Sequence, residues 1–162
     1  MRFRANWVLL AGLLAAQGAA VQASETRPAL KVTTTGGNMF DLVAQRGHWV
    51  IVNYWATWCA ACLEEMPTLR SFAAAHPEVR LIGLTYEHIA PQTLRRFLAA
   101  HPAGYPVAQV DQSALPHALK PVWFGMHALP LTYAIAPDGT VAKRWVGELD
   151  AAKLLAVVGR RR

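Results

Sequence analysis

The chain has 162 residues, of which 54% are hydrophobic, and a formal charge of +6 at neutral pH. This length corresponds to one domain with a sizeable core, and no internal repeat, low-complexity run or second-domain boundary interrupts it. The chain is basic, but its aromatic residues are not interleaved with its basic residues, so nucleic-acid binding is not indicated. The three arginines at residues 160–162 are interpreted as a solubilising end rather than as a membrane-binding site.

The first 23 residues have the three parts of a secretory signal peptide. Arg2 and Arg4 form a basic start, and an unbroken apolar run extends from Trp7 to Ala16. The tripeptide Val21-Gln22-Ala23 fits the small-x-small pattern that directly precedes a cleavage site, here before Ser24. The sequence therefore predicts a signal peptide at residues 1–23 and a folded domain after it.

An uncleaved membrane anchor is the alternative for this segment. The apolar stretch over residues 7–21 is interrupted by Gln17, and it is shorter than the ~20 residues that a spanning helix needs. Cleavage is therefore favoured, which would leave a domain of residues 24–162 in the periplasm. The domain would stay anchored to the membrane only if the signal were retained.

Apolar and alternating segments between turn residues predict the strands, and apolar spacings of three and four predict the helices. Strands are expected at residues 30–35, 39–43, 49–55, 79–85, 105–110, 131–135 and 141–146. Helices are expected at residues 59–75, 91–100 and 151–158, and a short helix broken by two prolines is expected within 113–124. This order predicts an α/β fold with a mixed central sheet flanked by helices on both faces and an added N-terminal β-hairpin.

The two cysteines of the chain, Cys59 and Cys62, lie where the third strand meets the first helix. A Cys-x-x-Cys pair at such a junction is typical of redox sites. Free N–H groups and the positive end of the helix dipole favour the thiolate of the first cysteine, and the second lies one turn inside the helix. A purely structural bridge is disfavoured, because a link across four residues restricts the unfolded chain very little.

Three motifs resemble the thioredoxin superfamily, and within it the exported TlpA/ResA-like thiol-disulfide oxidoreductases. They are Trp55-Ala56-Thr57-Trp58-Cys59, Glu65-Met66-Pro67 and Leu129-Pro130-Leu131-Thr132. The resemblance implies a thioredoxin-like fold over most of the domain. It also implies that Pro130 has a cis peptide bond and faces the cysteines, at an edge where an extended partner chain can bind.

The sequence departs from the family pattern at three places. Ala60-Ala61 stands between the cysteines, where many members have a proline before the second cysteine. Asn53 replaces the buried aspartate that serves thioredoxins as a proton acceptor, and Asn cannot titrate. Leu129 stands where related proteins often carry a small or β-branched residue, and it would narrow the partner groove or make it more apolar.

Glu65 is the candidate replacement for the missing proton acceptor. It follows Cys62 by three residues and therefore lies one turn along the same helix face. The resemblance to ResA-like proteins also points to this glutamate as an active-site acid. The alternative is a carboxylate of the first turn that only favours the helix dipole.

These residues predict thiol-disulfide exchange in which Cys59 attacks a partner disulfide and Cys62 then releases the partner. Trp58 is expected to contact the partner together with Leu129 and Pro130. The favoured direction is reduction of exported proteins by a monomer without a cofactor, supplied with electrons by a membrane donor of the DsbD/CcdA type that the resemblance implies. Oxidase and isomerase directions stay open, and apocytochrome c is a substrate of relatives that no residue here identifies.

Metal handling is the alternative from another functional class, because two thiolates can bind Cu(I) or Zn²⁺. The six histidines are scattered and do not complete a site of two cysteines and two histidines. They are His48, His76, His88, His101, His117 and His127. His127 is the candidate nearest to Pro130 in the sequence. A binding module without redox turnover is disfavoured, because it would not need both cysteines.

Overall fold

The computed structural model describes residues 27–120 and 128–159. The predicted signal peptide, the C-terminal arginines and His127 lie outside the described residues. The strands are β1 (Lys31–Thr33), β2 (Met39–Asp41), β3 (Val50–Trp55), β4 (Arg80–Thr85), β5 (Val107–Gln109), β6 (Leu131–Ile135) and β7 (Val141–Val146). The α-helices are α2 (Ala60–Ala75), α3 (Pro91–Ala100) and α4 (Ala151–Val158), and the 3-10 helices are η1 (Val43–Gln45), η2 (Gln112–Ala114) and η3 (His117–Leu119).

Five of the strands form a mixed sheet in the order β5-β4-β3-β6-β7. Strands β3, β4 and β5 are parallel, whereas β6 is antiparallel to both β3 and β7. The central strand β3 is buried along its whole length, as its nearly continuous apolar sequence predicts. Because β3 and β4 are parallel, the segments that follow them leave the sheet side by side, at the C-terminal ends of the two strands.

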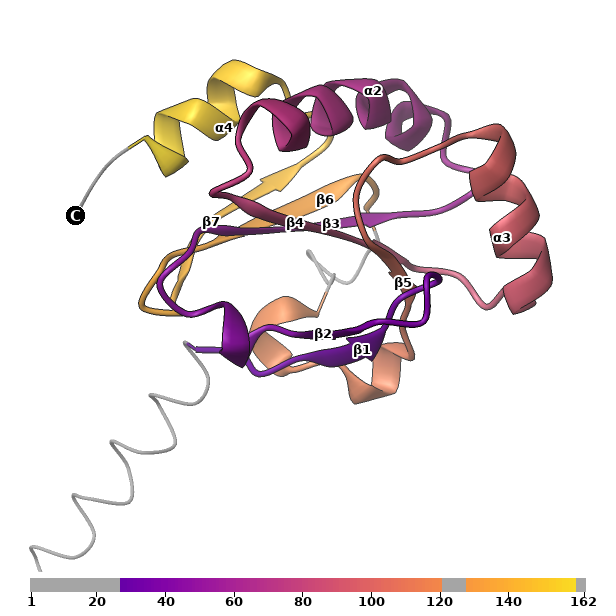
Figure 1. Ribbon diagram of the computed structural model, residues 1–162, viewed down its shortest axis with the longest axis horizontal. Helices are drawn as coiled ribbons and strands as arrows, with labels where there is room; N and C mark the ends of the chain where they lie inside the picture. Colours follow the sequence, from indigo (N-terminus) through magenta and orange to yellow (C-terminus); the bar gives the residue numbers. More distant parts are fainter. Residues whose placement is uncertain (1–26, 121–127, 160–162) are drawn as a thin grey trace, which may run out of the picture.

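The two faces of the sheet are covered differently (Figure 1). Ile51 and Trp55 point to the face on which α2, α3 and α4 pack. Val52 points to the opposite face, where it meets Phe40 of the β1-β2 hairpin and Leu119 of η3. Helical turns therefore cover both faces, as predicted, but those on the hairpin face are short 3-10 turns and the α-helices of the described chain share the other face.

The N-terminal hairpin is attached to the edge of the main sheet as well as to its face. Thr34 forms an isolated antiparallel bridge with Ala108. The backbone N–H of Thr35 also donates to the carbonyl of Val107 across 2.7 Å. The added hairpin thus covers one face of the sheet and the outer edge of β5.

Most of the predicted elements are confirmed within about two residues at each end. The short helix expected within residues 113–124 is confirmed in part: the described residues form two 3-10 helices, η2 and η3, instead of an α-helix, and they are separated at Pro116 as predicted. Pro121 lies outside the described residues. Pro116 stands between these two turns and is the N-cap of η3. A proline there lacks the N–H that a continuous helix would require.

Candidate active site

Cys59 and Cys62 form a disulfide at the N-terminus of α2, with an S–S distance of 2.04 Å and Cα atoms 5.3 Å apart. Cys59 is the N-cap of the helix, and its sulfur accepts a hydrogen bond from the backbone N–H of Cys62 across 3.3 Å. Cys59 is 7% exposed and Cys62 1% exposed. In the reduced state, the same N–H and the helix dipole would stabilise a thiolate on Cys59, which is the more accessible sulfur.

Glu65 lies one turn along α2 from Cys62 and is only 3% exposed. Its Oε1 accepts a hydrogen bond from the side-chain amide of Asn53 across 2.7 Å, and its Oε2 accepts one from the backbone N–H of Leu149 across 3.0 Å. Burial raises the pKa of the Glu65 carboxyl to about 7, although these two hydrogen bonds oppose the change. The carboxyl can therefore bind or release a proton near neutral pH.

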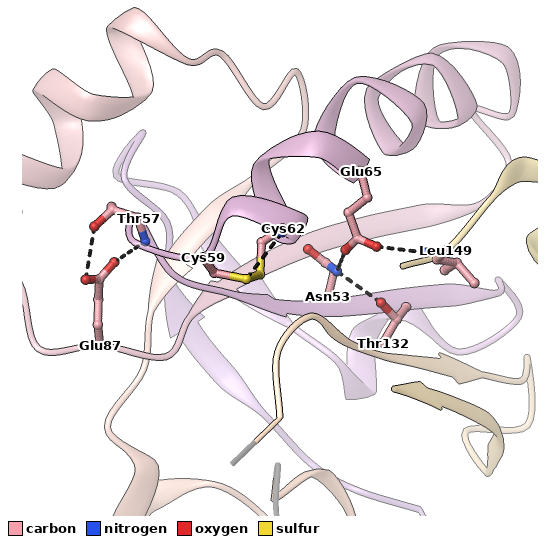
Figure 2. The surroundings of a disulfide bond; sticks show 8 residues. All are labelled: Asn53, Thr57, Cys59, Cys62, Glu65, Glu87, Thr132 and Leu149. Carbon is pink, nitrogen blue, oxygen red and sulfur yellow. Dashed lines mark hydrogen bonds between the residues drawn. A yellow bond between two sulfur atoms is a disulfide. The ribbon is translucent and has the colours of Figure 1, made fainter. Parts of the chain in front are cut away.

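Asn53 joins this carboxyl to the sheet. Its amide donates to Glu65 and also to the hydroxyl of Thr132, which lies 3.0 Å away. Asn53 and Thr132 are opposite each other in the antiparallel register of β3 and β6. The network links β3, α2, β6 and the residue that precedes the N-cap of α4, and Figure 2 shows it on one side of the disulfide.

A second carboxylate lies on the other side of the disulfide (Figure 2). Glu87 accepts a hydrogen bond from the backbone N–H of Thr57 at Oε1, across 2.6 Å, and one from the Thr57 hydroxyl at Oε2, across 3.1 Å. Thr57 lies in the loop between β3 and α2, two residues before Cys59. The loop that presents the first cysteine is therefore held by a residue that follows β4.

The residues expected to contact a partner differ in exposure. Trp58 is 69% exposed beside Cys59. Trp55, which precedes it in the same motif but was not expected to contact a partner, is fully buried between the sheet and the helices. The Leu129-Pro130 peptide bond is cis, as the family resemblance implied. Leu129 is partly buried and packs against the cluster of buried residues that contains both cysteines. The structure thus brings Leu129 to the dithiol and leaves the indole of Trp58 open to solvent.

The Pro130 loop is also connected to the segment before α4. The backbone N–H of Gly147 donates to the carbonyl of Pro130 across 2.9 Å. Gly147 has φ of +86°, in the left-handed region that favours glycine. Two residues later, Leu149 donates to Glu65. The segment 147–149 therefore contacts both the proline loop and the buried carboxyl.

The metal-binding alternative gains no support from the described residues. Within residues 27–120 and 128–159, no group of three or more His, Cys, Asp or Glu side chains could hold a metal ion. His76 and His101 are the C-caps of α2 and α3, as their positions at helix ends suggest. His127, the candidate nearest to Pro130 in the sequence, lies outside the described residues, so a role for it as a ligand stays a hypothesis.

The sequence model of the AhpC/TSA family matches residues 23–144. The chain belongs to the AhpC/TSA family. Sporulation thiol-disulfide oxidoreductase A of Bacillus subtilis is 26% identical to this family member over 156 residues, which cover 91% of each chain. Thiol-disulfide oxidoreductase ResA of Bacillus thuringiensis is 27% identical over 136 residues, or 83% of this chain and 75% of that protein.

This AhpC/TSA family member has the same fold as a solved structure of the thioredoxin family. The crystal structure of a thiol:disulfide interchange protein of the thioredoxin family from Chlorobium tepidum superposes with a TM-score of 0.69 at 21% identity. The match covers 83% of this chain and 93% of that chain. The predicted thioredoxin-like fold and the predicted resemblance to ResA-like thiol-disulfide oxidoreductases are confirmed.

Two features of the site were not predicted from the sequence. One is the contact of Glu65 with the backbone of Leu149, which carries no side-chain signal. The other is the contact between Glu87 and Thr57. The second could have been found, because both residues follow neighbouring parallel strands, whose C-terminal ends meet at one edge of the sheet.

Proposed function

We propose that the protein exchanges electrons with disulfides of exported proteins in the bacterial periplasm, and that it acts there as a reductase. The observation that carries this proposal is the Cys59–Cys62 disulfide at the N-terminus of α2, one helical turn from the buried carboxyl of Glu65. The similarity to two thiol-disulfide oxidoreductases supports the same chemistry. The two sulfurs carry the electrons themselves, so the reaction needs no bound cofactor.

The reaction begins with the reduced protein. The Cys59 thiolate attacks one sulfur of a partner disulfide, which forms a mixed disulfide and releases the other partner sulfur as a thiolate. Cys62 then loses its proton and attacks Cys59, which forms the Cys59–Cys62 disulfide and releases the second partner sulfur. Two electrons pass to the partner, and its two thiolates take up protons. Run in reverse, the same steps oxidise a partner dithiol.

Glu65 is the proposed proton acceptor for Cys62. A buried thiol ionises poorly, so the second step requires a base close to Cys62. A pKa of about 7 allows the Glu65 carboxyl to hold a negative charge before this step and a proton after it. The alternative role in the helix dipole is disfavoured, because Glu65 points into the core and hydrogen bonds to Asn53 rather than facing solvent at the helix end.

Trp58, Leu129 and Pro130 are proposed to bind the partner. The exposed indole of Trp58 offers a large apolar surface beside the reacting sulfur. Pro130 directly precedes β6, an interior strand, and its cis peptide bond shapes the loop at the start of this strand, where an extended partner segment would lie. Leu129 packs against the cysteine cluster and would border this groove.

Reduction in an oxidising compartment requires a continuous supply of electrons. The TlpA/ResA-like resemblance supports a membrane donor of the DsbD/CcdA type and apocytochrome c as one client. No helix within the described residues is long and apolar enough to cross the membrane. We propose a monomer that is released into the periplasm after cleavage of residues 1–23, or is anchored there if that segment is retained.

The reduction potential of Cys59/Cys62, measured by equilibration in glutathione or dithiothreitol buffers, tests the direction of electron flow. A value near that of thioredoxin, about −270 mV, would support the reductase. A value near that of DsbA, about −120 mV, would make the protein an oxidant and overturn the proposed direction. A pair that does not form a disulfide in solution would overturn the exchange chemistry itself.

A further inference from the structure

Glu87 holds the loop that presents the nucleophilic cysteine. Its carboxylate accepts from both donors of Thr57, across 2.6 Å for the backbone N–H and 3.1 Å for the hydroxyl. A hydrogen bond to an ionised oxygen is shorter and stronger than one between neutral groups. A single side chain therefore restrains both the backbone and the side chain of Thr57 at the start of the active-site loop (Figure 2).

The register of the sheet explains why these two residues meet. Trp55 is opposite Thr85 at the ends of β3 and β4, and the backbone N–H of Tyr86 donates to the carbonyl of Trp55 across 2.8 Å. Thr57 and Glu87 each follow this last pair by two residues. Thr57 and Glu87 therefore stay aligned just beyond the ends of the parallel strands β3 and β4, and these strands hold both residues in place.

Restraint at Thr57 is transmitted to Cys59 through a tight turn. The backbone N–H of Cys59 donates to the carbonyl of Ala56 across 3.1 Å, so that Thr57 and Trp58 are the central residues of the turn. Cys59 then becomes the N-cap of α2. The hydrogen bonds from Thr57 to Glu87 thus fix the middle of the turn whose end carries the sulfur.

The charge of Glu87 also acts on this sulfur. Thr57 and Cys59 are two residues apart within one tight turn, and the carboxylate contacts the backbone of Thr57, so it lies on the order of 10 Å from the Cys59 sulfur. A negative charge at that distance disfavours a thiolate. Glu87 is partly buried, and it also lines a surface hollow of about 860 Å³ together with His88 and Asp111. Solvent therefore screens part of the interaction.

We propose that Glu87 is a positioning residue with two separable effects: it holds the turn that presents Cys59, and its charge opposes the Cys59 thiolate and so favours the disulfide over the dithiol. This inference rests on the proposed thiol-disulfide exchange. A reduced form that is stabilised by its thiolate makes an oxidant, so a carboxylate near Cys59 favours the reductase direction. Glu87 and Glu65 then act on different cysteines from opposite sides of the disulfide.

Two substitutions separate these effects. Glu87→Gln retains an oxygen that can accept from the Thr57 N–H and an amide that can donate to its hydroxyl, but it removes the charge. Glu87→Ala removes the charge and both hydrogen bonds. Glu64→Gln is the matched control. Glu64 is an exposed carboxylate of α2, five residues after Cys59, and it makes no hydrogen bond to the active-site loop like those that Glu87 makes to Thr57.

The titration of the Cys59 thiol, followed by thiolate absorbance in the reduced protein, reports the charge. In both Glu87 variants, we expect the acid dissociation constant of the Cys59 thiol to rise roughly two- to twenty-fold. This range is the effect of removing one unit charge at about 10 Å, with the dielectric constant of water as the lower limit and that of a protein surface as the upper limit. The rise should shrink in 1 M salt. The glutathione equilibrium should shift towards the dithiol, and Glu64→Gln should shift both readouts less. An unchanged titration in Glu87→Gln would overturn the charge effect.

The exchange rate at high pH, where the thiolate is fully formed, reports the positioning. Here Glu87→Gln should react at nearly the wild-type rate, whereas Glu87→Ala should react several-fold more slowly because its turn is no longer fixed. Equal rates for the two variants would overturn the positioning role. The titration needs no partner, so it still tests Glu87 if the wild-type protein reduces no protein disulfide, a result that would count against the proposed function instead.

Discussion

Oε1 of Glu65 accepts a hydrogen bond from the side-chain amide of Asn53 across 2.7 Å, between the helix that carries the dithiol and the central strand of the sheet. Burial in the core disfavours the charged form of this carboxyl, and the hydrogen bond from Asn53 offsets part of that cost. Thioredoxins, which this stretch resembles, carry an aspartate on the strand. Here the titratable group belongs to the helix, and the strand contributes a fixed donor.

Glu65→Gln should remove the pH dependence of exchange near neutrality. Glutamine cannot take the proton of Cys62, and loss of a general base typically costs 10²–10⁴-fold in rate. We therefore expect slower release of the mixed disulfide and a rate profile that no longer changes around pH 7. Stopped-flow kinetics between pH 5 and 9 check this, with Glu64→Gln as the exposed control. A variant with the wild-type profile would return Glu65 to a role in the helix dipole.

The same carboxyl should make the fold less stable as the pH rises. Its pKa is raised by burial from 4.5 to about 7, so between these values the folded state holds a proton that the unfolded state releases. The free energy of unfolding should fall by up to about 3 kcal/mol from pH 4.5 to pH 7 on account of this group and then level off. Urea denaturation measures the slope, which Glu65→Gln should lack.

Asn53→Asp should convert the hydrogen bond into repulsion. Two carboxylates at hydrogen-bond distance cannot both ionise in the core, so the pair would share a proton and show one apparent pKa well above the usual range. We expect a loss of about 3 kcal/mol in the free energy of unfolding at pH 8 and a smaller loss at pH 5. Thr132→Val is the control: it removes one hydrogen bond of Asn53 and should cost about 1 kcal/mol, with no added pH dependence.

The two cysteines should give different products when they are replaced singly. Cys62→Ser retains the more exposed sulfur and should accumulate mixed disulfides with partner proteins, because no thiol remains to release them. Cys59→Ser should accumulate none and should be inactive. Non-reducing electrophoresis and mass spectrometry of trapped products distinguish these results. Normal turnover by Cys62→Ser would contradict the assigned roles.

Trp58→Ala should weaken partner binding without weakening the fold. Its indole is 69% exposed, so the free energy of unfolding should change by less than about 0.5 kcal/mol. Loss of an aromatic contact at the centre of an interface should raise KM about tenfold. Trp55→Ala is the contrasting variant, because that indole is fully buried and its removal should cost about 3–5 kcal/mol. Unchanged KM in Trp58→Ala would exclude it from the partner site.

Local patterns in the sequence were sufficient for most of the fold. The buried strand β3 was predicted from its apolar run, and the strands β6 and β7 and the helix α4 were predicted within one residue of their ends. The turn at residues 137–140 and the N-cap at Asp150, which set those ends, depend on residues close in the chain. The break at Pro116 was predicted, but the 3-10 type of the two turns was not, because prolines allow several short conformations and packing of Leu115 and Leu119 against the sheet selects one.

The candidate site was predictable where side-chain type carries the chemistry. The cysteines and Glu65 follow from spacing along one helix. The donor from Leu149 does not, because it is a backbone N–H 84 residues away, and any residue except proline could supply it. The contact of Glu87 with Thr57 needs the register of two parallel strands, which the sequence indicated only as neighbouring segments.

The two edges of the main sheet affect whether other extended chains can pair with this protein. At one edge, Thr34 and Thr35 of the N-terminal hairpin pair with the backbone of β5. At the other edge, β7 exposes the charged side chains of Lys143 and Arg144. Unpaired strand edges recruit other extended chains, and bound or charged edges resist this. The proposed function brings partner segments in extended conformation to this protein, and the paired edge at β5 and the charged edge at β7 should hinder co-aggregation with them.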